Sequence, residues 1–566
     1  MKSKFIYIIA ASVCGFMLTG CYDLDRAPAN QLSSLTFYKN QTHADEAMMG
    51  VYSVMRNENC MGVNYRFDVL GGLCDGAVQK VTTVQVGTYD ASSAFLISSW
   101  QTTYEGIARA NMVLQNINNT NMTESLKAQY RGEARFMRGL YYFFLYKLWG
   151  GVPIYDESFN VENYEQMNYP RSSGEQTIDF ILADMDSAIA VLPEAWDAAN
   201  LGRATKYAAL ALKGKVLLYR KRYQEASECF QKVIDSGRYE LYPNYADLFQ
   251  PEADNCNEMI FSIQTTSGAT SNVGLPSCLY LGTRSTWGWD WNQDYPSVEL
   301  VDSYEYKNGR PFDWDDFIPN FSESNNVKKA TFRATFEGNK VSKYPAAKDK
   351  LLAMYKQRDP RMSASVILPY THYLGYADNH EIDCEYAIAG SSIKGANWGY
   401  IQVDRGLEVY LWRKFVPVGD MGGQMFDRKQ TPINFPLIRY ADVLLMQAEC
   451  LNELGDQPDA ISLINQVRAR AGVALINNGS PWTRATTHDE VFQRIVHERA
   501  VELACEGHSY FDLKRWGMLD TLNDRRVCDI TGTYRWTRKV TDRDYLWPIP
   551  SSEVEKNPNL EQNPGW

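Results

Sequence analysis

Aromatic side chains alternate with polar ones in the segment Thr286–Pro296, TWGWDWNQDYP. Trp287, Trp289 and Trp291 are spaced two residues apart, and Tyr295 follows them, so in an extended chain the three indoles would share one face. An indole face is apolar and electron-rich, which suits the C–H groups of a pyranose ring. The neighbours of these residues are glycine and polar residues rather than the aliphatic residues of a core strand, and this favours an exposed aromatic platform over burial.

Three further residues complete the predicted ligand site. Trp314 adds another ring, and Asp290 and Asn292 can accept hydrogen bonds from sugar hydroxyls. A core strand is the alternative for the aromatic segment, and at least one of its rings can face inward under either interpretation.

Acids beside aromatic residues also occur in glycosidase clefts, where two carboxyl groups flank the scissile bond. Trp289-Asp290-Trp291 and Asp313–Asp316 have this composition, but acids in a sugar-binding loop are equally expected without catalysis. His497-Glu498 is followed by Val501 where a zinc-peptidase motif needs histidine, and the sequence has neither a GxSxG nor a GxxxxGK motif. We therefore expect no catalytic residues, no cofactor and no metal site.

The N-terminus has the layout of a secretory signal. Lys2 and Lys4 precede an apolar run, and Leu18-Thr19-Gly20-Cys21 ends it. We predict a signal peptide over residues 1–20, lipidation of Cys21, and a tether over residues 21–42. No later stretch is apolar and long enough to span a bilayer, so we expect the membrane to be bound by the lipid anchor alone.

Charge and cysteine content exclude some classes of protein. Without the signal, 55 basic residues stand against 68 acidic ones, a net charge of −13, and nucleic acid is an unlikely partner. A local basic patch would be needed to bind a polyanion. Nine cysteines remain, without a CxxC pair, and we expect mostly buried free thiols.

Helical periodicity covers most of the chain outside residues 271–430. Tyr207–Arg220 and the segment from Tyr223 to Val233 predict an amphipathic helix pair. The same small and bulky positions recur 234 residues later, and this repeat is typical of tetratricopeptide pairs. The matched positions are Gly214 with Ala448, Leu217 with Leu451, Ala226 with Ala460, Phe230 with Ile464, and Val233 with Val467.

Four more helices are expected, enough for about four pairs in all: His43–Met55, Trp100–Ile117, Ala128–Trp149 and Thr177–Leu192. We predict a mainly α fold with a scaffold over residues 43–270, including ligand-side loops at about 60–98, and C-terminal scaffold helices and tail over residues 431–566. Residues 271–430, rich in Gly, Pro, Asn, Asp and aromatic residues, are predicted to form a loop-rich ligand-binding insertion with short strands.

Several motifs resemble those of the SusD/RagB lipoproteins of the Bacteroidetes outer membrane. In the C-terminal third, RYADVLLMQAE and INQVRARAG resemble two family helices, and the segment from Glu498 to Gly517 resembles ERxxELxxEGxRxxDLxRWG, with His508 and Ser509 replacing the usual polar pair. LWPIP and NPNLEQNPGW resemble the family's ending, and FMRGLYYFFLYKLWGGVPI and SVELVDSYEYKNGR fit further upstream.

The resemblance implies four tetratricopeptide-like pairs that support a variable, ligand-facing lobe. It also implies a lipid-anchored cell-surface protein of the outer membrane that captures a polysaccharide or oligosaccharide and delivers it to a SusC-like TonB-dependent transporter, without catalysis. A peptide-binding import lipoprotein, as RagB is, remains the alternative, and a glycoside hydrolase is the third. The charged residues of the motifs, Glu498, Arg499, Glu502, Glu506 and Arg515, are expected to be paired structural charges.

Overall fold

The computed structural model describes residues 37–76, 83–159, 168–268, 273–288, 290–391, 399–403 and 406–566. Its helices are α3 (Gln41–Ser53), α4 (Arg66–Leu70), α6 (Ala94–Asn116), α7 (Glu124–Trp149), α8 (Gly174–Val191), α9 (Lys206–Tyr219), α10 (Tyr223–Asp235), α11 (Ser277–Leu281), α12 (Val298–Ser303), α13 (Trp314–Phe317), α14 (Asn325–Phe332), α15 (Lys348–Tyr355), α16 (Pro360–Ser365), α17 (Tyr440–Glu453), α18 (Gln457–Ala471), α19 (His488–Glu502), α20 (Ser509–Trp516) and α21 (Ser551–Lys556).

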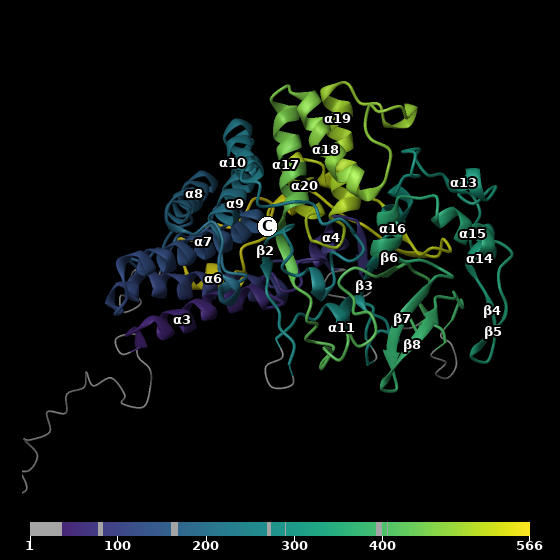
Figure 1. The fold of residues 1–566 in the computed structure, drawn as a ribbon, viewed down its shortest axis with the longest axis horizontal. Helices are drawn as coiled ribbons and strands as arrows, with labels where there is room; N and C mark the ends of the chain where they lie inside the picture. Colours follow the sequence, from purple (N-terminus) through teal and green to yellow (C-terminus); the bar gives the residue numbers. More distant parts are fainter. Residues whose placement is uncertain are drawn as a thin grey trace, which may run out of the picture.

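The strands are short and pair two by two, antiparallel throughout the described ranges. They are β1 (Cys74–Gly76), β2 (Met259–Ile263), β3 (Asp294–Pro296), β4 (Thr335–Glu337), β5 (Lys340–Lys343), β6 (Val366–Ile367), β7 (His372–Ala377), β8 (His380–Glu385), β9 (Leu411–Trp412), β10 (Phe435–Arg439), β11 (Arg526–Cys528) and β12 (Tyr534–Thr537). The predicted fold class is confirmed: the protein is mainly α, with a loop-rich insertion that contains short strands (Figure 1).

Eight helices of the described ranges form the scaffold as packed pairs, namely α3 with α6, α7 with α8, α9 with α10, and α17 with α18. Neighbouring pairs also pack on each other, and α10 contacts α17 although the whole insertion separates them in sequence. The helix starts are fixed by side-chain caps at Asn40, Thr123, Ser173, Thr205 and Asp456. Together, periodicity and capping explain why the helices were predictable.

The repeated small residue of the pairs marks a close helix approach. Gly214 of α9 faces Phe230 of α10, and a Cβ added at Gly214 would lie 2.6 Å from the phenyl ring. In the second copy the equivalent partner is the smaller Ile464, and the equivalent small residue is Ala448. The larger ring therefore requires the smaller residue opposite it.

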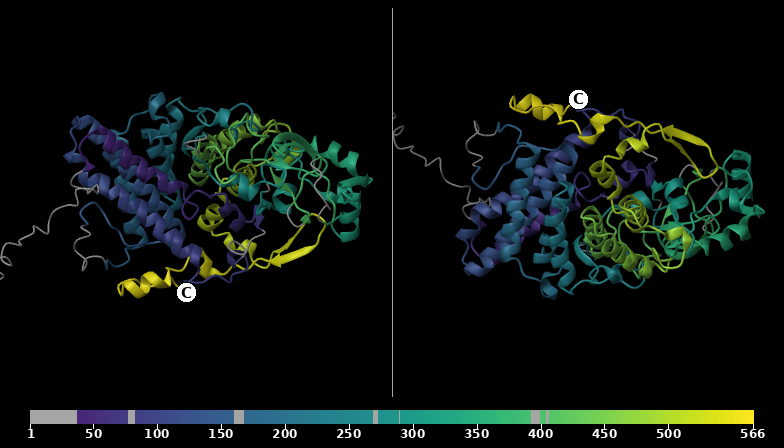
Figure 2. Two further views of the ribbon diagram at one scale, coloured as in Figure 1. Left: turned by 90° about the horizontal axis from the view of Figure 1, so that it is seen from below. Right: turned by 90° about the horizontal axis from the view of Figure 1, so that it is seen from above.

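The insertion leaves and re-enters the scaffold at one place. β2 precedes it and β10 follows it, and these strands pair with Phe435 opposite Ile263 and Arg439 opposite Met259. The insertion extends to one side of the scaffold (Figure 1), and the C-terminal hairpin of β11 and β12 runs beside it in both views of Figure 2. The predicted boundaries at residues 271 and 430 stay predictions.

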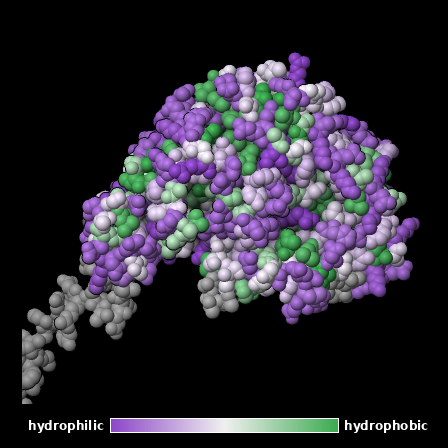
Figure 3. Space-filling model, in the orientation of Figure 1, coloured by the Kyte–Doolittle hydropathy of each residue, from purple (hydrophilic) through white to green (hydrophobic). Residues whose placement is uncertain are grey.

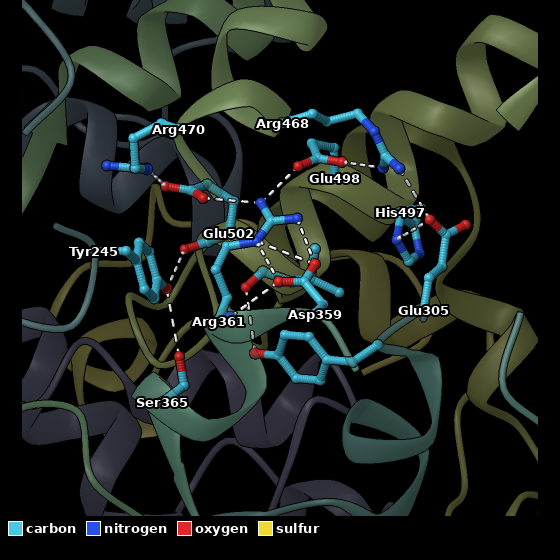
Figure 4. A network of polar contacts seen from close by, with 12 residues as sticks. Tyr245, Glu305, Asp359, Arg361, Ser365, Arg468, Arg470, His497, Glu498 and Glu502 are labelled. Atoms are coloured by element: carbon cyan, nitrogen blue, oxygen red, sulfur yellow. Dashed lines mark hydrogen bonds and ion pairs between the residues drawn. The ribbon is translucent and has the colours of Figure 1, made fainter. Parts of the chain in front are cut away.

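A buried network of charges joins the insertion to the scaffold (Figure 4). Arg361, in α16 of the insertion, donates hydrogen bonds to Asp359 and reaches Glu498 and Glu502 of α19 at 2.5 and 2.9 Å. Arg468 of α18 donates to the other oxygen of Glu498 at 2.9 Å. Because α16 and α18 approach α19 through these carboxylates, ion pairs as well as apolar packing fix the insertion in place.

Arg439, at the end of β10, occupies a second part of this network. Its guanidinium contacts Glu258, Glu502 and Glu506 at 2.7, 2.8 and 2.7 Å, and all four side chains are fully buried. Lys414, from the insertion, pairs with Glu506 at 2.6 Å. Burial raises the pKa of Glu502, but the charges of nearby arginines outweigh it and hold the pKa below its ordinary value.

The network extends to Asp442 of α17, which pairs with Lys215 of α9 and Arg499 of α19. Arg499 also pairs with Asp512 of α20 at 2.8 Å, and Arg515 pairs with Asp512 and Glu449. The prediction that the charged motif residues are paired and structural is confirmed. The nine cysteines in the described ranges are free thiols and mostly buried, also as predicted.

His508 lies beside Lys215, with 3.4 Å between its Nδ1 and the lysine Nζ. Burial, reinforced by the Lys215 charge, lowers the pKa of His508 to about 3. An unfolded histidine binds a proton below about pH 6.5, so between pH 6.5 and 3 the unfolded state binds more protons. This group therefore contributes stability that is present above pH 6.5 and is lost as the pH falls.

We expect His508→Asn to flatten the decline of stability below pH 6.5. The wild type should lose up to about 1.4 kcal/mol more per pH unit than the variant, measured by urea denaturation at several values between pH 7 and 5. His372→Asn, at an exposed histidine, is the control and should follow the wild-type slope. Equal slopes for His508→Asn and the wild type would contradict the assignment.

No helix within the described ranges combines the length and the apolarity needed to cross a bilayer. In Figure 3, hydrophilic residues dominate the visible face and hydrophobic ones gather in small groups among them. The predicted signal peptide and Cys21, the predicted site of lipidation, lie outside the described residues.

Candidate functional site

A cavity of about 780 Å³ opens between the insertion and the C-terminal hairpin. One wall comes from the aromatic segment near β3, and another comes from β12 and the turn before it. The rest is formed by the segment just before β9 and by Arg284, Arg333 and Gly390. The lining residues are Arg284, Trp291, Gln293, Tyr295, Arg333, Gly390, Gly406, Leu407, Glu408, Asp529, Thr533, Arg535 and Trp536. It combines aromatic rings with charged groups, as ligand pockets commonly do.

Trp291 is the exposed ring of this cavity, with 42% of its surface accessible. Its centroid lies 5.9 Å from that of Tyr280, at an interplanar angle of 57°. The guanidinium carbon of Arg428 lies 5.9 Å from the centroid of the Trp291 ring. Tyr280 is fixed in turn by Arg66, whose guanidinium lies 4.1 Å from its centroid. The indole is thus supported from its sides while part of its surface stays open.

Two carboxylates of the lining are held by hydrogen bonds. Glu408 accepts a bidentate pair from Arg333, with both distances 2.7 Å, and a further bond from Thr531 at 3.0 Å. Asp529 accepts from the backbone N–H groups of Thr531 and Thr533, each at 3.0 Å. Both acids are buried. They shape the wall of the cavity rather than standing free in it.

The structure breaks up the predicted aromatic platform. Gly288 and Asn292 adopt left-handed backbone conformations, with φ of 73° and 47°, so the segment is not a straight strand with alternating faces. Trp287 stacks on Tyr376 at 6.1 Å and is half-buried, outside the lining of the cavity. Of Trp287 and Trp291, the two tryptophans of this segment that the structure describes, only Trp291 lines the cavity. Trp289 lies outside the described residues.

Asp290 and Asn292 are not exposed, and the expectation that their side chains face a ligand is wrong. Asp290 is 1% accessible and accepts hydrogen bonds from the Cys278 thiol at 2.9 Å and the Trp287 backbone at 3.2 Å. Burial raises its pKa well above the ordinary range. Asn292 is fully buried, and its backbone N–H donates to the Gly282 carbonyl at 2.9 Å. The polar residues beside the tryptophans in the sequence therefore do not indicate that their own side chains are exposed to solvent.

Trp314 is also buried, contrary to the prediction. Its ring stacks on Phe321 at 4.2 Å and 15°, and its Nε1 donates to Asp302 at 2.8 Å. The acids beside it have a local role, since Asp313 caps α13 by accepting from the Asp315 backbone N–H. They remain at the surface while the ring points inward. Tyr295 is largely buried as well, but it lines the cavity.

The C-terminal hairpin contributes residues that the sequence reasoning missed: Asp529, Thr533, Arg535 and Trp536. The segment Tyr534–Thr537 alternates aromatic and polar residues, as the segment around Trp291 does. This was a usable signal, but its position more than two hundred residues from Trp291 in the sequence concealed it.

A smaller cavity of about 140 Å³ is lined by Arg66 and mainly by apolar residues, including Phe67, Phe95 and Trp547. Arg66 also donates to Gln293 of the larger cavity at 3.3 Å. Thus a hydrogen bond between two lining residues links the walls of the cavities. Among the described residues, no cluster of three or more His, Cys, Asp or Glu side chains is arranged to hold a metal ion.

Two family models match the chain. One, described as the SusD family, matches residues 257–566, and the other, described as starch-binding and associating with the outer membrane, matches residues 24–218. SusD-like protein P25 of Formosa agariphila is 24% identical over 567 residues, covering 96% of each chain.

Solved structures share the fold. A SusD-like carbohydrate-binding protein of Bacteroides fragilis superposes with a TM-score of 0.75 at 25% identity, covering 93% of this chain and all of that one. A laminarin-binding SusD-like protein gives a TM-score of 0.66 at 23% identity, covering 94% of this chain and all of that one. These likenesses extend over both the helical scaffold and the insertion.

Proposed function

The chain belongs to the SusD family, and on this premise we propose that it is a non-catalytic glycan-binding lipoprotein of the outer-membrane surface. It captures a polysaccharide or oligosaccharide and delivers it to a SusC-like TonB-dependent transporter. The description of the second matching family, starch-binding and associating with the outer membrane, supports both the ligand class and the location. So do the carbohydrate-binding and laminarin-binding proteins that share its fold.

The observation that carries the proposal is the open indole of Trp291 in a cavity large enough for a short saccharide. A pyranose stacks its C–H face on such a ring, and Gln293 and Thr533 in the same lining offer hydrogen bonds to hydroxyl groups. Trp536 lies on the hairpin side, so a chain of sugars can meet aromatic groups from both parts of the protein.

The absence of catalysis is proposed from the carboxylates. Glycoside hydrolysis needs one carboxyl as acid and another as base or nucleophile. Glu408 is tied to Arg333 and Thr531, and Asp529 to backbone N–H groups of the hairpin. Incubation with polysaccharides should release no reducing ends, and turnover that survives rigorous purification would count against the proposal.

Trp291→Ala should weaken glycan binding at least tenfold while leaving the melting temperature nearly unchanged. Burying a large apolar side chain is worth roughly 1.5–3 kcal/mol, and part of that is offset by ordering the glycan. Titration calorimetry against an oligosaccharide panel, with peptides included, measures the effect. Trp482→Ala, at a similarly exposed tryptophan outside the cavity, is the matched control and should bind like wild type.

If Trp291→Ala binds glycan with the same affinity as wild type, Trp291 is not part of the glycan-binding site. Binding of peptides but of no glycan would favour the alternative, a peptide-import protein of the RagB kind.

Anchoring is tested by Cys21→Ala in the full-length protein. Acyl chains supply about 0.8 kcal/mol per buried CH₂, so the variant should leave the membrane fraction. The assay is run with the partner transporter deleted, and a variant that still sediments with outer membranes would refute lipidation at Cys21.

Delivery to a transporter predicts a stable partner. Detergent extraction and pull-down of the wild-type protein should return a TonB-dependent barrel, since a lipid-anchored binder cannot move a glycan across the membrane by itself. Repeated recovery of this chain alone would contradict delivery.

A further inference from the structure

The cavity concentrates arginine in a chain that is acidic overall. Arg284, Arg333 and Arg535 line it, against the two carboxylates Glu408 and Asp529, whereas the whole sequence has a net charge of −11. A local excess of positive charge in a recess is felt strongly, because the low-dielectric walls focus the field. The lining thus carries more positive than negative side chains, whereas the chain as a whole is acidic.

The arginines of the cavity differ in whether a carboxylate of the protein already neutralises them. Arg333 is bound in a bidentate pair to Glu408, whose side chain is only 7% accessible. That pair satisfies both groups and leaves little charge for a ligand. Arg333 therefore serves to fix the wall.

Arg535 is not satisfied in this way. Its Nε lies 3.7 Å from Asp529 Oδ2, beyond hydrogen-bond distance. The same Nε is shielded from solvent and has no hydrogen-bond partner among the described residues. Asp529 accepts three hydrogen bonds within the hairpin, all at Oδ1, from Thr531 N, Thr531 Oγ1 and Thr533 N. Its Oδ2 faces Arg535 as an ion-pair partner that is too distant for a hydrogen bond. The Arg535 side chain is 29% accessible, so the other N–H groups of its guanidinium can donate to a ligand in the cavity.

The surroundings of Arg535 suit a saccharide substituent. Trp536 follows it directly on β12, and Trp291 lies in the wall contributed by the insertion. A sugar ring held by an indole places its exocyclic group next to the ring, where a guanidinium can reach it. The planar fork of arginine matches the two oxygens of a carboxylate or sulfate in a bidentate manner.

We propose that the cavity binds saccharides that carry an anionic group, a carboxylate or a sulfate, and that Arg535 binds this group. The inference rests on the proposed glycan-binding function and specifies its ligand class. Arg284 adds positive charge to the same lining. The acidic surface elsewhere disfavours densely charged polyanions such as nucleic acids, so selectivity comes from this recess.

The test compares one hexuronic-acid backbone in two charge states and adds a sulfated oligosaccharide. The wild-type protein is titrated with a hexuronic-acid oligosaccharide, with its methyl ester, and with a sulfated oligosaccharide. We expect at least one anionic form to bind at least tenfold more tightly than the ester, and this preference to shrink in 0.5 M salt. The acid and sulfate arms identify which anionic group is recognised.

Arg535→Gln should abolish the preference for the anionic forms while leaving the melting temperature unchanged, and Arg535→Lys should keep part of the preference. Arg526→Gln, on the neighbouring strand and outside the cavity lining, is the matched control. Preferential or equal binding of the ester relative to both anionic forms, or a preference that survives Arg535→Gln, would overturn the inference.

The outcome also separates this inference from the proposed function. Neutral saccharides that bind through Trp291, without any preference for anionic forms, would overturn only the ligand class. Failure of every saccharide to bind would overturn both.

Discussion

Replacing Arg439 by methionine should lower the free energy of unfolding by about 3–5 kcal/mol, because removal of one partner leaves buried charges uncompensated. Glu258, Glu502 and Glu506 all contact this guanidinium and are fully buried. Lys414 and Arg470 still pair with two of these carboxylates, Glu506 and Glu258, so the loss comes from the excess of buried negative charge that remains. Methionine preserves much of the side-chain volume, so the loss reports on charge rather than on a cavity.

Urea denaturation followed by far-UV circular dichroism measures this change. Arg222→Gln removes an exposed pair with Glu225 and should cost less than about 1 kcal/mol. Arg439→Lys should recover only part of the loss, because an ammonium group cannot reproduce a guanidinium that donates to three carboxylates. A loss below 1 kcal/mol for Arg439→Met would mean that the network is dispensable for folding.

Trp314→Ala should also destabilise the fold by about 3–5 kcal/mol, as expected for removing a large core ring. Trp314 packs face to face on Phe321 and edge to face on Phe332, and it donates to Asp302. It lies outside the lining of the cavity. The folded fraction of the variant should therefore bind glycan with wild-type affinity, the reverse of the pattern expected for Trp291→Ala.

Thermal melts and calorimetry on the same preparations test this contrast. Binding lost in Trp314→Ala without loss of stability would return this residue to the ligand site, as the sequence alone had suggested.

The helices were predictable because their signals are local. The apolar spacing of Tyr223–Asp235 and the capping residues Ser173 and Thr205 lie within or beside the helices that they specify. The sequence also predicted correctly that the charges of the C-terminal motifs are paired. It did not identify the partners, because most of them lie on other elements, and Arg361 and Lys414 come from the insertion.

The site was less predictable because its geometry is tertiary. The alternation of Trp287 and Trp291 implied one face only if the chain stayed extended, and the left-handed residues Gly288 and Asn292 prevent that. The contribution of Arg535 depends on a hairpin that reaches the insertion from the other end of the sequence. Side-chain chemistry identified the region around Trp291, whereas only the fold shows which groups share a cavity.

The pairing of β2 with β10 has a consequence for how such proteins diversify. Adjacent strands lie about 4.7–4.9 Å apart, so the lobe between them begins and ends at almost the same point. Recombination or engineering can therefore exchange the lobe without altering the spacing of the helices beneath it. A transplanted lobe has to carry cations equivalent to Arg361 and Lys414, since the buried carboxylates of Glu498 and Glu506 would otherwise each lose a positively charged partner. Ligand specificity can thus be transferred together with the lobe, provided that the hairpin carrying Arg535 and Trp536 still completes the cavity.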